Sequence, residues 1–312
     1  MHNLENVRCV TCDYGPVQPA DNGVVCINCG ATYHRFRGMP VFLSAENSLF
    51  PPDAYDDGKT PSSGGQNLSK LLKPLVPTRS INLSRDRMFQ RIAADYGTNE
   101  LKILVIGCGR ARTAIEAAFA RTKFSFCHTD IDVNSDGDVI CDAHDLPFQS
   151  ESFDGVITTA VMEHVLNPDV VASEIVRVLT PGGFVYSEVP FLQAVHEGAY
   201  DFTRFSLSGH RRLFERFDEK DAGMVAGPGT ALVWQINECA RFLVPTRPLS
   251  AVVRLVLRYL TFWIKYIDYL VAKHPRAVDA ASGTYFYGTL RPTPVDAADI
   301  IRRYGDMSFT HT

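Results

Sequence analysis

The stretch from Lys102 to Phe191 constrains the fold more than any other part of the chain, because short apolar segments alternate there with helical segments and sharp turns. It opens with the β-branched, apolar run 102–106, which leads into Gly107-Cys108-Gly109 and then into an alanine-rich segment, 111–121, without proline or glycine. This order predicts a buried strand, a tight turn and a helix. Repetition of the pattern predicts an α/β, Rossmann-like sheet with helices on both faces.

The glycine turn is the first candidate binding site. Glycine accepts a positive φ, and without a Cβ it lets the backbone approach a ligand closely. The helix that follows would direct its unpaired N–H groups at the same point. In a Rossmann-like sheet this crevice binds nucleotides, whereas a tight turn without a ligand is the alternative for two glycines considered alone.

Two further strands are expected to carry carboxylates to the same edge of the sheet. The segment 124–130 ends in Asp130, about twenty residues after the glycines, where a carboxylate accepts hydrogen bonds from two ribose hydroxyls. Asp132 is the alternative. The segment 138–148 carries Asp142, which would accept from the adenine amino group, and Asp145, which we assign to a surface turn.

The connection between these two strands is unusually short. Only twelve positions separate Asp130 from Asp142, whereas a crossover that contains a helix needs about a dozen or more residues. We therefore expect a bare loop here, which leaves one side of the adenine pocket thin.

The pattern continues with a strand at 152–159, an amphipathic helix at 168–179 and a strand at 184–189. Residues 101–191 resemble the class I S-adenosylmethionine-dependent methyltransferases in the glycine turn, the two acidic positions, Glu163-His164 and Pro181-Gly182-Gly183. The resemblance implies S-adenosylmethionine as the cofactor. The residues that it assigns to cofactor binding are Gly107, Cys108, Gly109, Asp130, Ile131, Asp142, Ala143 and Thr159.

A hydride-transferring dehydrogenase is the rival interpretation of a glycine turn followed by an acid. The spacing does not support it, because the turn is not Gly-x-Gly-x-x-Gly and Arg110 and Arg112 fill the intervening places. Ala111 replaces the third glycine of the usual turn, which methyltransferases tolerate.

The N-terminus carries two Cys-x-x-Cys pairs, Cys9 with Cys12 and Cys26 with Cys29. Each pair presents two thiolates on one side of a tight turn, and two pairs complete a tetrahedral Zn²⁺ site without an open position, so the zinc would be structural. Disulfides in a secreted domain are the alternative, but the sequence near Met1 has no signal-peptide core. The segment up to Leu43 resembles small zinc-ribbon proteins that partner tRNA, ribosomal RNA and protein methyltransferases, and the ribbon fused to some rRNA methyltransferases.

The ribbon raises nucleic acid as a substrate, and charge argues against it. The chain has a formal net charge of −4, whereas RNA-binding enzymes usually show a basic surface. Two basic runs are present: Arg79, Arg85, Arg87 and Arg91, and Arg204, Arg211, Arg212 and Arg216. We favour ordinary solvated helix faces for both.

The loop 189–206 follows the last of these strands and is the candidate acceptor site. His196 is the first choice for the base that removes the acceptor's proton, and His164 is the second. Tyr200, Asp201 and Arg204 are candidate substrate ligands. A purely structural role is the alternative for two residues of the loop: His196 would hydrogen-bond Asp201, and Arg204 would pair with Asp201 or Glu197. The loop resembles methyltransferase-domain proteins associated with polysaccharide synthesis, and that resemblance extends over residues 80–292.

Charged residues interrupt the apolar segment 231–270, among them Arg254, Arg258, Lys265 and Asp268, so it contains no run of about eighteen uncharged apolar residues and is not expected to span a membrane. We expect it to pack into its own domain or against a second copy, with peripheral docking on a membrane as the alternative. The predicted organisation is a zinc ribbon, 1–44; a linker or lid, 45–78; a methyltransferase domain, 79–292, with a helical insertion at about 230–275; and a tail, 293–312.

These observations predict a cytoplasmic methyltransferase that acts on a hydroxyl of a sugar or glycan-related small molecule. One alternative is an RNA methyltransferase whose ribbon binds the substrate. The other is a non-catalytic module that keeps the fold and recruits a partner, against which the intact Gly107, Gly109 and Asp130 argue.

Overall fold

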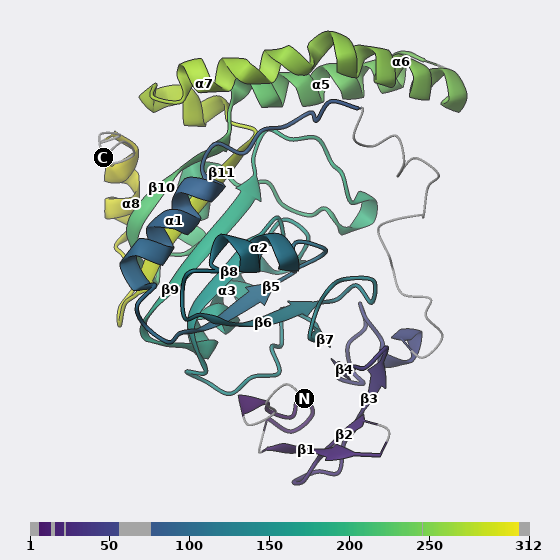
Figure 1. Cartoon of the computed structure of the whole chain (residues 1–312), viewed down its shortest axis with the longest axis vertical. Coiled ribbons are helices and arrows are strands. Elements are labelled where there is room, and N and C mark those ends of the chain that lie inside the picture. Colours follow the sequence, from purple (N-terminus) through teal and green to yellow (C-terminus); the bar gives the residue numbers. More distant parts are fainter. Residues whose placement is uncertain (1–5, 14–15, 22, 56–75, 245, 306–312) are drawn as a thin grey trace.

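A computed structural model describes residues 6–13, 16–21, 23–55, 76–244 and 246–305, and its strands form one sheet that crosses the whole molecule (Figure 1). The sheet has eleven strands in the order β1-β2-β3-β4-β7-β6-β5-β8-β9-β11-β10. The N-terminal strands are β1 (Val17–Ala20), β2 (Gly23–Cys26), β3 (Thr32–Phe36) and β4 (Met39–Phe42). The others are β5 (Lys102–Ile106), β6 (Ser125–Asp130), β7 (Val139–Cys141), β8 (Phe153–Thr159), β9 (Leu179–Pro190), β10 (Phe217–Ala226) and β11 (Gly283–Leu290).

The central strands β7, β6, β5, β8 and β9 are parallel, as the alternating pattern predicts, and β10 and β11 add an antiparallel edge. The chain builds outward from β5 in one direction through β6 and β7, and then in the other through β8 and β9. The sheet order therefore reverses between β5 and β8. Ligands of open α/β sheets bind at the carboxyl ends of the strands at such a point.

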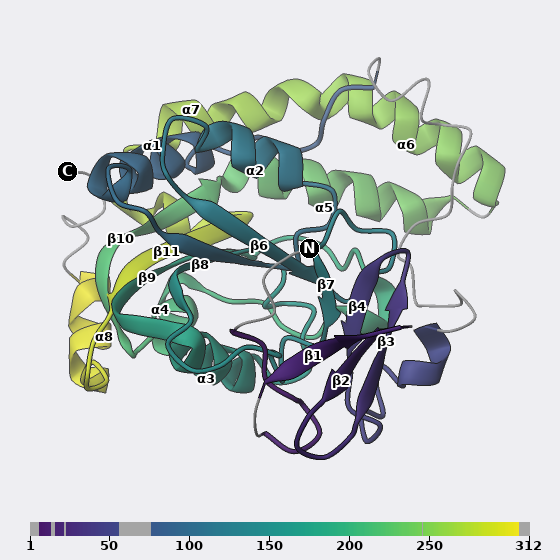
Figure 2. The same cartoon turned by 60° about the horizontal axis from the view of Figure 1, so that its bottom comes forward.

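Helices cover both faces of the sheet, which confirms the predicted fold class. Figure 2 shows α1 (Arg85–Tyr96) and α2 (Arg112–Ala118) on one face, and α3 (Pro168–Val178) and α4 (Leu207–Leu213) on the other. The sequence explains α3 directly: Pro168 stands at its first turn, where no N–H is needed, and Val171, Ile175 and Val178 recur on its buried face.

The loop between β6 and β7 contains no helix, as the short spacing predicts. The space beside it is taken by the segment that follows the N-terminal strands. The 3₁₀ helix η2 (Pro52–Tyr55) lies there, with Tyr55 fully buried and its hydroxyl donating to the carbonyl of Ile131 at 3.1 Å. Part of the segment predicted as a linker or lid, 56–75, lies outside the described residues.

The N-terminal strands join the central sheet, which the sequence did not predict. β4 pairs with β7 in parallel, with Val41 opposite Ile140 and Phe42 opposite Cys141. Arg8 adds a polar contact, because it donates to the carbonyl of Leu146 at 3.1 Å and forms an ion pair with Asp145. Asp145 therefore anchors the N-terminal region, where the sequence suggested only a surface turn.

Residues 228–271 form a separate helical layer along one end of the sheet, at the top of Figure 1. It comprises α5 (Pro228–Leu243), α6 (Arg247–Thr261), η6 (Phe262–Tyr266) and α7 (Ile267–Val271). None of the described helices is long and apolar enough to cross a membrane. The remaining elements are η5 (Gly198–Tyr200), η7 (Pro275–Ala280) and α8 (Ala297–Gly305), the last of which lies in the predicted tail.

Candidate active site

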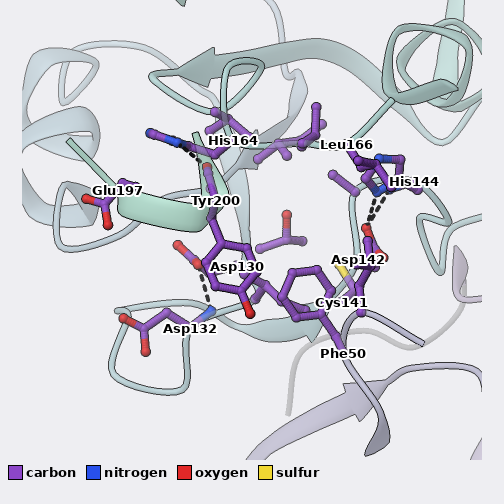
Figure 3. A pocket seen from close by; sticks show the side chains of 18 of the residues that line it. Phe50, Asp130, Asp132, Cys141, Asp142, His144, His164, Leu166, Glu197 and Tyr200 are labelled. Atoms are coloured by element: carbon purple, nitrogen blue, oxygen red, sulfur yellow. Dashed lines mark hydrogen bonds and ion pairs between the residues drawn. The ribbon is translucent and has the colours of Figure 1, made fainter. Parts of the chain in front are cut away.

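The main cavity opens at the carboxyl ends of β5, β6 and β8 and has a volume of about 480 Å³. Figure 3 shows Asp130 and Asp142 at two sides of it, with the ring of Phe50 between them. Its lining contains most of the residues predicted to bind the cofactor and three of the predicted acceptor-site residues. Those residues are Gly107, Gly109, Asp130, Ile131, Asp142, Ala143, His164, His196 and Tyr200.

The glycine turn has the conformation that the sequence argument requires. Gly107 has φ +65°, and a Cβ there would lie 2.3 Å from the side chain of Val161. Gly109 has φ +50°, and a Cβ there would meet only open space on the cavity side. The turn thus leaves room for a ligand to lie directly on the backbone.

Asp130 is fixed at the end of β6 by two backbone N–H groups. Gly109 donates to its Oδ2 at 2.6 Å, and Asp132 donates to its Oδ1 at 2.9 Å. Burial raises the pKa of Asp130, and these hydrogen bonds oppose that rise. The carboxylate is therefore held at the position predicted for a ribose ligand.

Two predicted cofactor residues do not line the cavity. Cys108 is buried, and its N–H donates to the carbonyl of Thr129 at 3.0 Å, so it supports the turn from behind. Thr159 ends β8, and the next two residues, Ala160 and Val161, line the cavity in its place. Their cofactor roles stay predictions of the sequence.

Asp142 lies at the opposite side of the cavity. Burial would raise the pKa of Asp142, but hydrogen bonds from His144 and Asn47 lower it overall. Nδ1 of His144 lies 2.6 Å from its Oδ1, and Nδ2 of Asn47 donates to its Oδ2 at 2.8 Å. The charged acceptor predicted for an amino group is thus present.

The N-terminal segment supplies a wall of this cavity that the sequence did not reveal. Leu49 and Phe50 line it, and the ring of Phe50 stacks against that of Tyr200 with centroids 6.1 Å apart and planes 21° apart. These residues occupy the side expected to be thin. They belong to the segment predicted as a linker or lid, 45–78, but without a periodic pattern the sequence did not single out these two residues.

A second cavity of about 300 Å³ meets the first at Ala160 and His196, which line both. Its lining is rich in polar side chains, most of which the sequence analysis missed. They include Ser80, Asn82, Arg85, Glu163, Glu188, Gln193 and Ser282. Glu188 is the centre of this group: Asn82 donates to its Oε2 at 3.1 Å, Arg85 to its Oε1 at 3.0 Å and the hydroxyl of Tyr186 to its Oε1 at 2.6 Å.

Glu163 and the two histidines predicted as bases gather where the cavities meet. Nε2 of His164 lies 3.5 Å from Oε1 of Glu163, and Nε2 of His196 lies 4.0 Å from it. The two imidazole rings meet edge to face with centroids 4.8 Å apart. Burial raises the pKa of Glu163 to about 8 and lowers that of His164.

Asp201 and Arg204 pair with each other, which was the alternative to a substrate role. Nη2 of Arg204 donates to Oδ2 of Asp201 at 2.6 Å, and Nε donates to the carbonyl of Gln193 at 3.0 Å. The backbone N–H of His196 donates to the same carboxylate at 2.9 Å. This pair therefore holds the loop that carries His196, and neither member lines the two cavities.

The four N-terminal cysteines are close together, and one ligand atom of each lies within 4.8 Å of the others. Sγ of Cys9 and Cys29 are 3.7 Å apart, and Sγ of Cys12 and Cys26 are 3.8 Å apart. Four sulfur donors in one group match the donor set of a structural zinc site. The arrangement is compatible with the predicted zinc ribbon.

Comparison with known proteins agrees with this geometry. Residues 104–187 match the family described as "Methyltransferase domain". The fold, the glycine turn and the family match together identify a class I S-adenosylmethionine-dependent methyltransferase domain, with a β-rich, cysteine-bearing region before it.

Among its relatives, the chain is 31% identical to a fatty-acid O-methyltransferase of Mycolicibacterium smegmatis over 37% of this chain and 47% of that protein. It is 28% identical to a phthiotriol/phenolphthiotriol dimycocerosates methyltransferase of Mycobacterium leprae over 43% of this chain and 54% of that protein. The chain thus spans about half the length of these relatives. A solved phosphoethanolamine N-methyltransferase 2 of Haemonchus contortus, in complex with S-adenosyl-L-methionine, is 18% identical, with a TM-score of 0.43 over 66% of this chain and 53% of that one.

Replacing Phe50 with alanine tests the wall supplied by the N-terminal segment. We expect Phe50→Ala to weaken binding of S-adenosylmethionine about tenfold, equivalent to ~1.4 kcal/mol, because an aromatic surface of the pocket is lost. Calorimetric titration measures the affinity. Glu46→Ala, an exposed change in the same segment that does not line the cavity, is the control. Unchanged affinity in Phe50→Ala would show that this wall does not contact the cofactor.

Proposed function

We propose that the protein transfers the methyl group of S-adenosylmethionine to a hydroxyl of a sugar or glycan-related molecule. The observation that carries the proposal is the meeting of two cavities at His196 and Ala160. One cavity has the glycine turn and Asp130 of a methyltransferase domain, and the other is lined by several polar side chains and is sized for a small acceptor. Methyl transfer requires two such ligands to meet end to end.

The residues of the first cavity fit the cofactor. Asp130 would accept hydrogen bonds from the ribose hydroxyls, Asp142 from the adenine amino group, and the open backbone at Gly109 would carry the part between. When bound, S-adenosylmethionine supplies an electrophilic methyl group. The protein then has to align the acceptor and let its proton leave.

The second cavity favours a hydroxyl-bearing acceptor. Glu188, Asn82, Arg85 and Gln193 offer both hydrogen-bond donors and acceptors there, the combination that a polyhydroxylated ring needs. Both mycobacterial relatives are named for lipids, one as an O-methyltransferase. A glycan carried on a lipid combines the polar cavity with those names, and we take it as the preferred acceptor class.

The proton of the acceptor hydroxyl would leave at the cluster of Glu163, His164 and His196. His196 is the best placed of the three because it alone lines both cavities. His164 lines only the first and Glu163 only the second. The three side chains touch one another, so we treat them as one functional unit.

An RNA methyltransferase is less well supported by the surface charges. In the first basic run, Arg91 pairs with Asp221 at 2.7 Å and Arg85 with Glu188. In the second, Arg211 pairs with Glu219 at 2.8 Å and Arg212 with Asp169 at 3.1 Å. Guanidinium groups held in such pairs offer little net charge to a phosphate backbone.

Location in the cytoplasm and the acceptor atom stay predictions.

Asp130→Asn tests the function directly. The substitution keeps the shape of the side chain and removes the charge that holds two hydroxyls, so we expect affinity for S-adenosylmethionine and S-adenosylhomocysteine to fall about tenfold to a hundredfold. Calorimetry provides the measurement, with Asp136→Asn, at an exposed residue of the same loop that lines neither cavity, as the matched control. If the native protein binds neither ligand, the methyltransferase proposal is wrong and the non-catalytic alternative holds.

The zinc site is tested through its effect on the cofactor pocket. We expect Cys29→Ser to lose the bound zinc and to weaken S-adenosylmethionine binding roughly tenfold, because the ribbon carries β4 and the Phe50 wall. Metal analysis and calorimetry on the same sample measure both effects. Cys239→Ser is the control, since Cys239 is also an exposed cysteine but lies on α5. Full zinc content in Cys29→Ser would contradict the four-cysteine assignment.

A further inference from the structure

Glu163 is a buried group that the cofactor site does not explain. Its side chain is 0% exposed, and neither carboxylate oxygen has a hydrogen-bond partner among the described residues. Leaving a carboxylate buried without partners is costly, and such groups in proteins are nearly always paired or bound to a metal. A partner for these oxygens is therefore to be expected.

The two histidines beside it are oriented like metal ligands. Nδ1 of His164 lies 2.8 Å from the carbonyl oxygen of Tyr200, and Nδ1 of His196 lies 3.4 Å from Oδ2 of Asp201. Both neighbours only accept hydrogen bonds, so each Nδ1 carries the hydrogen and each Nε2 presents its lone pair. A carbonyl or carboxylate behind the imidazole is the usual support of a metal-binding histidine.

The lone pairs of both rings point toward the same carboxylate. One ligand atom from each of Glu163, His164 and His196 lies within 4.8 Å of the other two. A single proton would join one Nε2 to one carboxylate oxygen and leave the second lone pair and the second oxygen unpaired. A divalent cation satisfies all three side chains together.

We propose that Glu163, His164 and His196 bind a divalent cation where the two cavities meet. Two imidazoles and a carboxylate suit Mn²⁺, Fe²⁺ or Zn²⁺ and leave coordination positions open. Those open positions face the cavities that His164 and His196 line. The binding site stands on the geometry of the three side chains, and only its role in the reaction rests on the proposed function.

That role is to activate the acceptor hydroxyl. A hydroxyl bound to a divalent cation has a lowered pKa, so it loses its proton near neutral pH. The O–H bond breaks and the proton passes to solvent, while the new O–C bond forms and the S–C bond of the sulfonium breaks. In this reaction the two histidines act as ligands of the metal ion, and the proton of the acceptor passes to solvent instead of to His196.

Mn²⁺ is the probe that separates this site from the cysteine cluster, because thiolates prefer softer ions. The zinc-loaded protein is titrated with Mn²⁺, and the free ion is followed by electron paramagnetic resonance. We expect one site per chain, weakened at least about tenfold in Glu163→Gln. Glu197→Gln makes the same charge change in the neighbouring loop and should leave Mn²⁺ binding unchanged. His196→Gln, a change at a partly exposed side chain, should weaken binding as Glu163→Gln does.

Two results would overturn the site: no bound Mn²⁺ in the native protein, or equal affinity in Glu163→Gln and Glu197→Gln. Calorimetry with S-adenosylmethionine on the same samples keeps the proposals apart. Mn²⁺ binding without cofactor binding would refute the methyltransferase and leave the metal site standing. Cofactor binding without a Glu163-dependent Mn²⁺ site would refute the metal site and leave the methyltransferase proposal standing.

A different observation supports a second inference, on the helical layer of residues 228–271. Large apolar side chains are exposed along it, among them Phe242 (81% exposed), Leu260 (62%), Trp263 (57%) and Leu270 (84%). Exposed apolar surface of this extent marks an interaction site. Figure 1 shows the layer at the outer end of the molecule, with one side uncovered by the rest of the described chain.

The charge of this layer selects its partner. Between residues 228 and 273 the basic residues are Arg241, Arg247, Arg254, Arg258, Lys265 and Lys273, and the acidic residues are Glu238 and Asp268. Glu238 pairs with Arg79 and Arg241, and Asp268 is buried and accepts from the backbone N–H of Gly227 at 2.9 Å and of Gly229 at 2.7 Å. The stretch is thus cationic in a chain whose net charge is −4.

We infer that this layer docks on an anionic membrane surface. An apolar helix face with arginines beside it, and with exposed aromatic residues such as Trp263 and Tyr266, is typical of interfacial binding. A second copy fits less well, because a twofold interface would place this cationic surface against itself, and the carboxylate of Glu238 already pairs with Arg79 and Arg241 of its own chain. The inference depends neither on methyl transfer nor on the metal site.

Co-sedimentation with vesicles tests the docking. We expect the native protein to bind vesicles of equal parts phosphatidylcholine and phosphatidylglycerol, and to bind phosphatidylcholine alone much more weakly. Leu260→Glu on α6 should reduce binding at least about tenfold, since it places a charge on the apolar face that would contact the membrane. Ile301→Glu, at an exposed apolar residue of α8, should not. Failure to bind the anionic vesicles, or a dimer that Leu260→Glu dissociates in sedimentation velocity, would overturn the inference.

Discussion

The pairing of β4 with β7 is the contact on which the rest of the molecule depends. β7 has three residues and no helix before it, so without β4 it would be a short, open edge strand. The chain leaves β4 directly into the segment that carries Asn47 and Phe50, which reach Asp142 and Tyr200. The N-terminal region therefore completes both the sheet and the side of the main cavity that carries Asp142.

The centre of the site shows a different balance of forces. Asp130, Asp142 and Glu188 are each held by several hydrogen bonds, which is the ordinary way to stabilise a partly buried carboxylate. Glu163 has no hydrogen-bond partner among the described residues and lies fully buried beside two imidazoles. This carboxyl group lies near the residues that line both cavities, and stability alone does not explain its placement.

Local pattern and family resemblance predicted what depends on neighbouring residues. Short-range spacing in the sequence was enough to predict the glycine turn, Asp130, the helix-free loop before β7 and the group of four cysteines. The β4–β7 pairing, the Phe50 wall and the polar second cavity were not. They join segments that are distant in the sequence, such as Asn82 with Glu188 and Val41 with Ile140. The sequence showed the two runs of arginine residues, but it did not show which acidic residues pair with them.

Trp234 gives the helical layer a direct connection to the wall of the second cavity. It belongs to α5, its indole donates to Ser80 at 2.9 Å, and the guanidinium of Arg79 lies 3.7 Å over its ring. These contacts connect the wall of the cavity directly to the outer helices. If the layer docks on a membrane and the second cavity holds the acceptor, as we propose, the methyl-accepting position would lie at a fixed height above the lipid surface. The site would then select acceptors by the distance between their reacting hydroxyl and the lipid part that holds them in the membrane.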